Sequence, residues 1–254
     1  MILDSFRLDG RVALVTGSSR GLGQGAAVAL AEAGADIALI DRGDPAETIA
    51  LVEAAGRRVH SVRRDLVGAA PADLASAVDE VVGELGRVDI LVNNAGTIRR
   101  APAAEYAAED WTDVLSVNLD AVFHLSQAAG RHMIAQGHGR IINVASMLSF
   151  QGGILVPAYT ASKHAVAGLT KALANEWAAS GVTVNAIAPG YMATDNTAAL
   201  RADTAREASI VSRIPAGRWG TPADLQGAFV FLASDAAAYV TGAIVPVDGG
   251  WLVR

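Results

Sequence analysis

Seven short apolar segments alternate with longer, alanine-rich segments along the 254 residues of the chain. The short segments are apolar at nearly every position, which is typical of strands in a parallel sheet that is covered on both faces. Strands are expected at 12–15, 37–40, 59–62, 90–92, 141–145, 182–187 and 244–247. Helices are expected near 22–33, 46–55, 71–84, 110–135, 158–178 and 221–233. This order predicts an α/β, doubly wound Rossmann fold, with a seven-stranded parallel sheet and helices on both faces.

The chain length suits a single domain over residues 1–254, and no internal repeat, low-complexity tract or linker divides the pattern. The least regular segment is 191–220, which holds Pro215, Gly217 and Gly220. Long irregular segments in a compact domain are often functional loops. We expect this one to form a substrate loop or lid.

The composition argues against several classes of function. The chain has no cysteine, which excludes disulfides, thiolate metal sites and a cysteine nucleophile, and no other residues have the spacing of a metal site. Its formal net charge of −6 argues against sequence-independent binding to nucleic acid, which depends on neutralising phosphates. No charge-free apolar run is long enough to span a bilayer, and the charges among the first ten residues argue against a secretory signal. We therefore expect a cytoplasmic protein with neither a nucleic-acid nor a membrane partner.

A glycine-rich turn, TGSSRGLG at 16–23, follows the first expected strand. Glycine lets a backbone turn sharply and approach a pyrophosphate closely, and the amides that open the next helix attract the anion. A tight connection without a ligand is the alternative, but the position between a strand and a helix favours a dinucleotide. The candidate cofactor residues of this turn are Gly17, Ser19, Arg20, Gly21, Leu22 and Gly23.

Asp41 ends the second expected strand, eighteen residues after Gly23. A carboxylate there can accept hydrogen bonds from both hydroxyls of the adenosine ribose, and it repels a 2′-phosphate. Arg42 and Arg20 argue the other way, because a guanidinium can hold that phosphate. We give Asp41 more weight, because a carboxylate that faces a dianionic phosphate is costly. NAD is therefore predicted and NADP is disfavoured, with an ordinary loop carboxylate as the alternative role of Asp41.

Four polar residues could carry proton chemistry. Tyr159 and Lys163 are four apart on an expected helix, so they share one face. A free phenol has a pKa near 10, and a nearby ammonium is expected to lower it. Ser146 directly follows the fifth strand and could bind a substrate oxygen, or else cap a turn. Asn118 starts or interrupts the helix after the fourth strand, either as a cap or as a group that holds a water beside Lys163.

These residues occur in the order and spacing of the short-chain dehydrogenase/reductase family, which the sequence resembles along its whole length. The shared elements are the G-x-x-x-G-x-G turn, Asp65, the NNAG run at 93–96, the four polar residues, the Pro189-Gly190 pair and the VDGG run at 247–250. The resemblance implies hydride transfer between a secondary alcohol and the C4 atom of the nicotinamide.

The resemblance also implies roles for individual residues. Tyr159 would be the general acid/base, Lys163 its tuner and a ribose ligand, and Ser146 a donor to the substrate oxygen. Asn118 would support the proton relay. Further cofactor contacts are implied for Asp65, Leu66, Asn93, Ala95, Gly96, Pro189, Gly190, Met192 and Thr194. A structural role is the alternative for the asparagines of the NNAG run.

Several stretches resemble sugar-acid dehydrogenases within the family, including NNAGTIRR at 93–100, ASMLSFQGG at 145–153 and RIPAGRWG at 213–220. They imply a small, hydroxylated carboxylate as the substrate, which a guanidinium can pair. The candidate substrate residues are Ser146, Tyr159, Arg99, Gln151 and Tyr191, with Arg100, Arg213 and Arg218 as alternatives. Each arginine could equally form a surface ion pair.

Other functions remain open at this point. A gluconate or polyol dehydrogenase and a 3-oxoacyl carrier-protein reductase are the alternatives within the family, and Asp41 and the net charge argue against the latter. A dinucleotide sensor without catalysis is the alternative of another class, and the presence of all four polar residues argues against it. The family resemblance implies a homotetramer, although the alanine-rich faces of 158–178 suit helix pairing and burial in the monomer equally.

Overall fold

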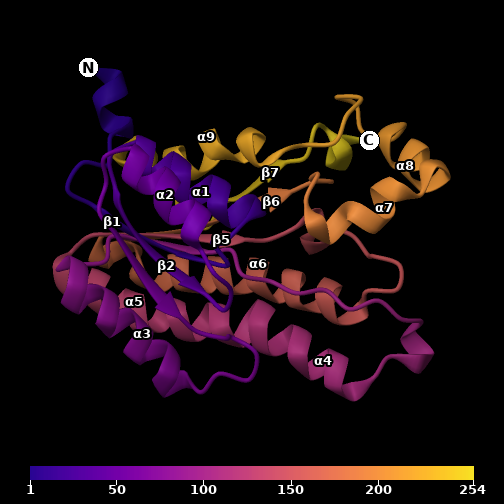
Figure 1. The fold of residues 1–254 in the computed structure, drawn as a ribbon, viewed down its shortest axis with the longest axis horizontal. Coiled ribbons are helices and arrows are strands. Elements are labelled where there is room, and N and C mark those ends of the chain that lie inside the picture. The colour runs from indigo at the N-terminus through magenta and orange to yellow at the C-terminus, as the bar shows by residue number, and fades with distance from the viewer.

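The computed structural model describes residues 1–254, apart from the side chain of Asn196, and it confirms the predicted fold. Seven parallel strands form one sheet in the order β3-β2-β1-β4-β5-β6-β7, between two layers of helices (Figure 1). The strands are β1 Val12–Thr16, β2 Asp36–Asp41, β3 Val59–Arg63, β4 Ile90–Asn93, β5 Gly139–Val144, β6 Val182–Pro189 and β7 Ile244–Val247. All seven coincide with expected strands to within a few residues.

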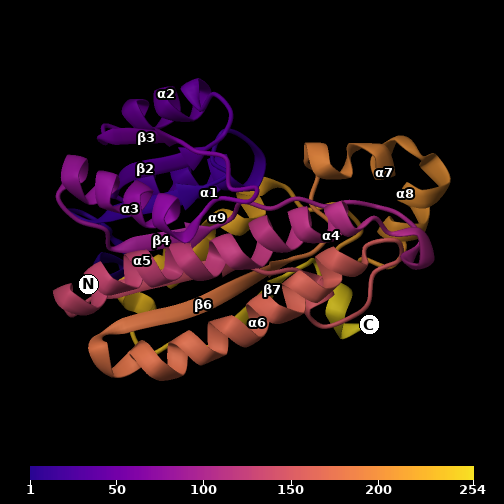
Figure 2. The ribbon, with the colours of Figure 1, turned by 90° about the horizontal axis from the view of Figure 1, so that it is seen from below.

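One layer of helices holds α1 Gly21–Glu32, α2 Ala46–Ala54 and α9 Pro222–Ala233. The other layer holds α3 Pro71–Leu85, α4 Ala108–Leu115, α5 Ala121–Gln136 and α6 Pro157–Trp177. Two short helices, α7 Ala198–Ala202 and α8 Thr204–Val211, stand at one end of the molecule (Figure 2). No helix in the part of the chain that the structure describes is both long and apolar enough to cross a membrane.

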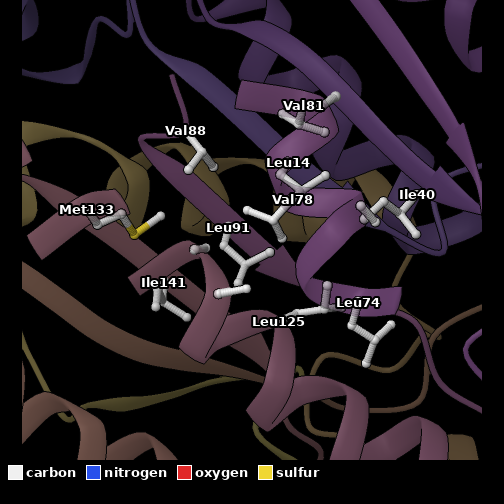
Figure 3. Close-up of a cluster of buried hydrophobic side chains, with 14 of the residues drawn as sticks. Leu14, Ile40, Leu74, Val78, Val81, Val88, Leu91, Leu125, Met133 and Ile141 are labelled. Atoms are coloured by element: carbon white, nitrogen blue, oxygen red, sulfur yellow. The ribbon is translucent and has the colours of Figure 1, made fainter. Parts of the chain in front are cut away.

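Successive strand residues contribute to two separate cores, which explains why the strands are apolar throughout. Leu14 packs in the core between the sheet and α3 and α5, whereas Ala13 and Val15 pack in the core on the opposite face. Figure 3 shows the first core, where Leu91 of β4 lies beside Val78 of α3. Side chains of a strand alternate between faces, so two covered faces require apolar residues at every position.

Two expectations about helices are corrected by the structure. The single helix expected at 110–135 is two helices, α4 and α5, joined by a π-helical turn over Ser116–Asp120. Side-chain periodicity does not reveal such a turn, because one wide turn displaces the pattern by a single residue. The irregular segment 191–220 contains α7 and α8, and the side chain of Asp203 caps α8 by accepting from the backbone N–H of Arg206 at 3.0 Å. That capping residue is the signal that sequence reasoning missed.

The sheet order reverses between β1 and β4, whose carboxyl ends lie side by side. The chain runs outward from β1 to β2 and β3, then returns to β4 on the other side. The helix α1 that follows β1 and the helices α4 and α5 that follow β4 cover opposite faces, so a crevice opens at this point, where ligands of such sheets bind.

Candidate active site

The glycine turn after β1 needs its glycines for reasons of space and backbone conformation. Gly17 has φ +62°, and a Cβ on it would lie 2.8 Å from the Cα of Ala95. Gly21 has φ +61°, and a Cβ on Gly23 would overlap the carbonyl oxygen of Gly17. Arg20 precedes α1 without capping it through a side-chain hydrogen bond. The amides that open α1 are therefore not satisfied by a side-chain cap, which suits an anion at this helix end.

The NNAG run holds the ends of β1 and β4 together. The Nδ2 group of Asn94 donates to the carbonyl oxygens of Thr16 and Gly17, at 2.9 Å each. The hydroxyl of Thr16 accepts from the backbone N–H of Ala95 at 2.9 Å. Asn93 is turned the other way, and its Nδ2 group donates at 2.9 Å to the side-chain oxygen of Asn143 in β5. These contacts support the alternative that both asparagines have a structural role.

Asp41 lies beside the glycine turn, as expected. Its two carboxylate oxygens accept hydrogen bonds from the backbone N–H groups of Ser19 and Gly43, at 2.8 Å each. Asp65 accepts from the N–H of Val67 at 3.0 Å in its own loop. Leu66 is buried and packs in the core between the sheet and α3, so its side chain serves the fold.

The structure brings Ser146, Tyr159 and Lys163 together at the carboxyl end of β5. The hydroxyl of Ser146 lies close enough to the phenol of Tyr159 to favour its phenolate. The ammonium of Lys163 lies 5.5 Å from the ring centroid of Tyr159, and it donates to the carbonyl oxygen of Val144 at 2.6 Å. Ser146 also accepts from the N–H of Leu148 at 3.1 Å. Ser146 therefore caps a turn and contacts the phenol at once.

The pKa of the Tyr159 phenol is raised, because burial disfavours the phenolate more than the hydrogen bond from Ser146 and the charge of Arg100 favour it. The expected lowering of this pKa by Lys163 is therefore wrong. Burial also lowers the pKa of Lys163 itself to about 8. The sequence does not reveal either direction, because burial depends on what other elements pack around the helix.

Asn118 lies in the π-helical turn and is fully buried. Its side-chain amide accepts from the N–H of Thr97 at 2.8 Å and donates to the carbonyl oxygen of Thr97 at 3.0 Å. It also donates to the hydroxyl of Ser162 at 3.2 Å, and Ser162 donates to the carbonyl oxygen of Tyr159 at 2.7 Å. The side chain is thus no helix cap, and it connects the loop after β4 to the helix that carries Tyr159.

The two ends of the segment 191–220 lie side by side, and the start of the segment contacts the glycine turn. The N–H of Gly220 donates to the carbonyl oxygen of Tyr191 at 2.9 Å, and its own carbonyl oxygen accepts from the N–H of Ala193 at 2.8 Å. Asp195 forms an ion pair of 2.9 Å with Arg20. A Cβ on Gly21 would lie 3.9 Å from the methyl carbon of Thr194. The start of the segment is therefore in contact with the glycine turn.

Residues at the base of this segment are packed tightly. Met192 is buried, and it packs in the core on the face of the sheet that α9 covers. The N–H of Gly190 donates to the carbonyl oxygen of Val247 at 3.0 Å, and a Cβ on Gly190 would lie 2.6 Å from the Cα of Asp248. Gly190, just after Pro189 at the end of β6, therefore fits tightly against the VDGG run.

The candidate substrate residues have different surroundings. Arg99 lies 3.3 Å from Asp110 and 3.8 Å from Asp113 on α4, so α4 neutralises its charge. Arg100 is exposed, and its charge acts on the phenol of Tyr159. This electrostatic link could not be found by sequence reasoning, because the two residues are far apart in the chain.

The remaining candidates lie in the segment 191–220 or in the loop before α6. The ring of Tyr191 packs edge-on against Trp219 and Trp251, with centroids 5.4 and 4.8 Å apart. Arg213 stacks on Trp251 at 4.0 Å, and Arg218 forms an ion pair of 2.7 Å with Asp224. Gln151 is half-buried in the loop before α6. Arg213 and Arg218 thus contribute to the packing of the segment 191–220.

A family model described as enoyl-(acyl carrier protein) reductase matches residues 17–252 of the chain. Together with the fold and the order of the site residues, this match places the chain in the short-chain dehydrogenase/reductase family, to which it belongs. Within the family, the chain is 58% identical over 257 residues to the 2-dehydro-3-deoxy-D-gluconate 5-dehydrogenase of Escherichia coli (strain K12), covering 100% of both chains.

Two further relatives are similar over nearly their whole length. The 2-dehydro-3-deoxy-D-gluconate 5-dehydrogenase of Bacillus subtilis (strain 168) is 56% identical, with 99% of this chain and 98% of the relative covered. A crystal structure of a gluconate 5-dehydrogenase from Burkholderia cenocepacia J2315, in complex with NADP and tartrate, has a TM-score of 0.94 at 43% identity and covers 100% of both chains.

Proposed function

We propose that this protein is a 2-dehydro-3-deoxy-D-gluconate 5-dehydrogenase, which transfers a hydride between the C5 position of that sugar acid and NAD. The observation that carries the proposal is the contact of the Ser146 and Tyr159 hydroxyls at the end of β5, with the ammonium of Lys163 beside the same ring. The names of the relatives from Escherichia coli and Bacillus subtilis support the substrate.

The residues around the glycine turn fit a dinucleotide. A Cβ would fill the space at Gly17 and Gly23, and the start of α1 lacks a side-chain cap. When bound, the nicotinamide supplies the hydride chemistry. We propose that the turn, together with Asp65, Ala95 and Thr194, forms the cofactor cleft. The backbone at Leu66, Asn93, Gly96, Pro189, Gly190 and Met192 would line it, which the tight packing of the Pro189-Gly190 pair supports.

The chain's own residues manage the proton. In the oxidation, the C5 carbon loses a hydride while its hydroxyl proton passes to the oxygen of Tyr159, and the reduction runs in the opposite sense. Ser146 would hydrogen-bond the substrate oxygen and keep it beside the phenol. Burial lowers the pKa of Lys163 to about 8, so its ammonium is still mostly protonated at pH 7 and would hold the ribose hydroxyls. Asn118 would hold the loop and the helix in register for this transfer.

Asp41 supports NAD as the preferred cofactor. Two backbone N–H groups hold its carboxylate next to the glycine turn, so the carboxylate cannot swing away to admit a 2′-phosphate without losing both hydrogen bonds. The relative from Burkholderia cenocepacia has NADP bound, and Arg20 and Arg42 give this chain positive charge in the same region. We therefore propose a preference for NAD that is partial, with NADP as a slower cofactor.

Among the arginines, Arg100 is the best candidate for the substrate carboxylate. Its charge acts at the phenol of Tyr159, where the substrate oxygen would bind. Tyr191 and Gln151 are proposed contacts for the substrate hydroxyls. The segment 191–220 would close over them as a lid, which its contacts with the glycine turn support. A homotetramer in the cytoplasm is proposed on the family resemblance alone.

A substrate panel tests the function. Initial rates with NAD should be highest for 2-dehydro-3-deoxy-D-gluconate, lower for D-gluconate and lowest for neutral polyols. Faster turnover of D-gluconate or of a neutral alcohol would overturn the assignment of the substrate. Tyr159→Phe should lower kcat by about 10²- to 10⁴-fold while NADH still binds, as measured by fluorescence. Undiminished turnover in that variant would overturn the proposed chemistry as well.

A further inference from the structure

A cavity of about 480 Å³ lies at the edge of the sheet opposite to Ser146. His138 and Arg140 line it from the start of β5, Thr183 from the start of β6, and Tyr239 and Thr241 from the turn before β7. A strand rises about 3.3 Å per residue, so β5 separates this cavity from Ser146 by roughly 25 Å. The cavity is thus separate from the proposed active site.

Positive charge exceeds negative charge beside this cavity. Arg140 is buried, and it donates to Asp235 at 3.1 Å. Arg11 lies 3.5 Å from Asp235 and 3.7 Å from Asp89. Asp89 is fully buried and already paired with Arg87 at 2.6 Å. Three guanidinium groups therefore share two carboxylates, which leaves one unit of positive charge.

Two polar groups in the wall of the cavity lack hydrogen-bond partners among the described residues. The Nδ1 atom of His138 accepts from Arg11 at 2.9 Å, so its proton resides on Nε2, which lies 3.7 Å from Asp235 and donates to no acceptor. The hydroxyl of Thr183 has no partner either, and this residue is 7% exposed. Buried polar groups are almost always paired, so two such groups at one cavity indicate a missing acceptor.

The pKa values of two groups in the cavity wall are lowered, mainly by burial and further by neighbouring guanidinium charges. Burial lowers the pKa of His138, and the charges of Arg140 and Arg11 lower it further, against the opposing effects of Asp89 and Asp235. Burial also lowers the pKa of Arg140, with Asp235 opposing and Arg11 adding to the shift. An anion in the cavity would offset these unfavourable charges.

We propose that this cavity binds a small oxyanion, a carboxylate or a phosphate, between His138, Arg140 and Thr183. The proposal does not depend on the proposed function, because none of these residues belongs to the active site. The fully exposed ring of Tyr239 stands at the rim, where it would cover the ligand.

Histidine NMR tests the proposal on the wild-type chain. Inorganic phosphate should raise the pKa of His138 saturably, because an anion favours the imidazolium. The other four histidines serve as internal controls and should keep their pKa values. Citrate, compared with phosphate at equal ionic strength, distinguishes a carboxylate from a phosphate ligand. An unchanged His138, or a change that chloride reproduces, would overturn the proposal, and so would exclusion of both anions by a second copy of the chain.

A variant isolates the contribution of the cavity wall. Thr183→Val keeps the shape of the side chain and should weaken phosphate binding about tenfold, because a hydrogen bond to a charged ligand is lost. Thr112→Val on the surface of α4 is the matched control and should bind as the wild type does. Equal binding by Thr183→Val and the wild type would contradict the proposed site.

Discussion

Lys163 donates a hydrogen bond of 2.6 Å to the carbonyl oxygen of Val144, the last residue of β5. This bond ties the helix α6 to the strand that ends beside Ser146. It also holds an ammonium in a buried place, where its pKa is about 8 instead of 10.5. The position of the ammonium is therefore unfavourable for stability, and the proposed chemistry provides a reason for it.

Lys163→Met should abolish activity without lowering the stability of the fold at pH 7. The lowered pKa of Lys163 corresponds to a cost of about 3 kcal/mol for burying its charge. In the wild type, the hydrogen bond of Lys163 offsets only about 1 kcal/mol of that cost, and this bond is lost in the variant. Because the folded-state pKa is depressed, the unfolded chain binds more protons between pH 8 and 10.5, so wild-type stability gains with pH there. In urea unfolding, the difference in the free energy of unfolding between the variant and the wild type should therefore decrease from pH 8 to 10.5. A variant that is clearly less stable than the wild type at pH 7 would contradict this account.

Asp41→Ala should reverse or narrow the preference between cofactors. Removal of the carboxylate eliminates the repulsion of a 2′-phosphate and the acceptor for the ribose hydroxyls. The ratio of kcat/KM for NAD to that for NADP should fall by about 10- to 100-fold. Asp44→Ala is the control, because Asp44 accepts a hydrogen bond from the N–H of Ala46 within its own loop. An unchanged ratio in Asp41→Ala would remove the basis for the NAD preference.

Arg100→Met should raise the KM for the sugar acid at least about tenfold, because a charge-assisted hydrogen bond to the carboxylate is lost. Arg99→Met should change KM by less than about twofold, since the charge of Arg99 is already paired with α4. Both variants remove one guanidinium, so the comparison controls for net charge. The opposite ranking in steady-state kinetics would assign the carboxylate to Arg99 instead.

Gly23→Ala should prevent cofactor binding and destabilise the chain by at least about 1–3 kcal/mol, because the new Cβ would overlap the carbonyl oxygen of Gly17. Gly83→Ala is the matched control within α3, where a Cβ meets nothing within 4 Å. It should stabilise the chain by about 0.5–1 kcal/mol through helix propensity. Thermal unfolding with and without NADH measures both effects. If the Gly23→Ala variant still bound NADH, that result would argue against the tight packing of this turn.

Local features of the chain were sufficient to predict the fold and the location of the site. The seven strands follow from apolar runs, and the position of Ser146 follows from its place directly after β5. Tyr159 and Lys163 share a helix face because four residues make about one turn. All of these features depend on residues that are close in sequence, so they can be predicted from periodicity and spacing.

The amino-acid sequence by itself therefore determined the order of strands and helices, the glycine turn after β1 and the grouping of polar residues at one sheet edge. The tertiary structure alone decided that the pKa of Tyr159 is raised, that Arg99 is neutralised by α4 while Arg100 acts on the phenol, and that Asn118 lies in a π-helical turn. It also decided that a charged cavity lies at the far edge of the sheet. The physical reason is that burial, pairing of charges and close packing are set by neighbours that are distant in the chain.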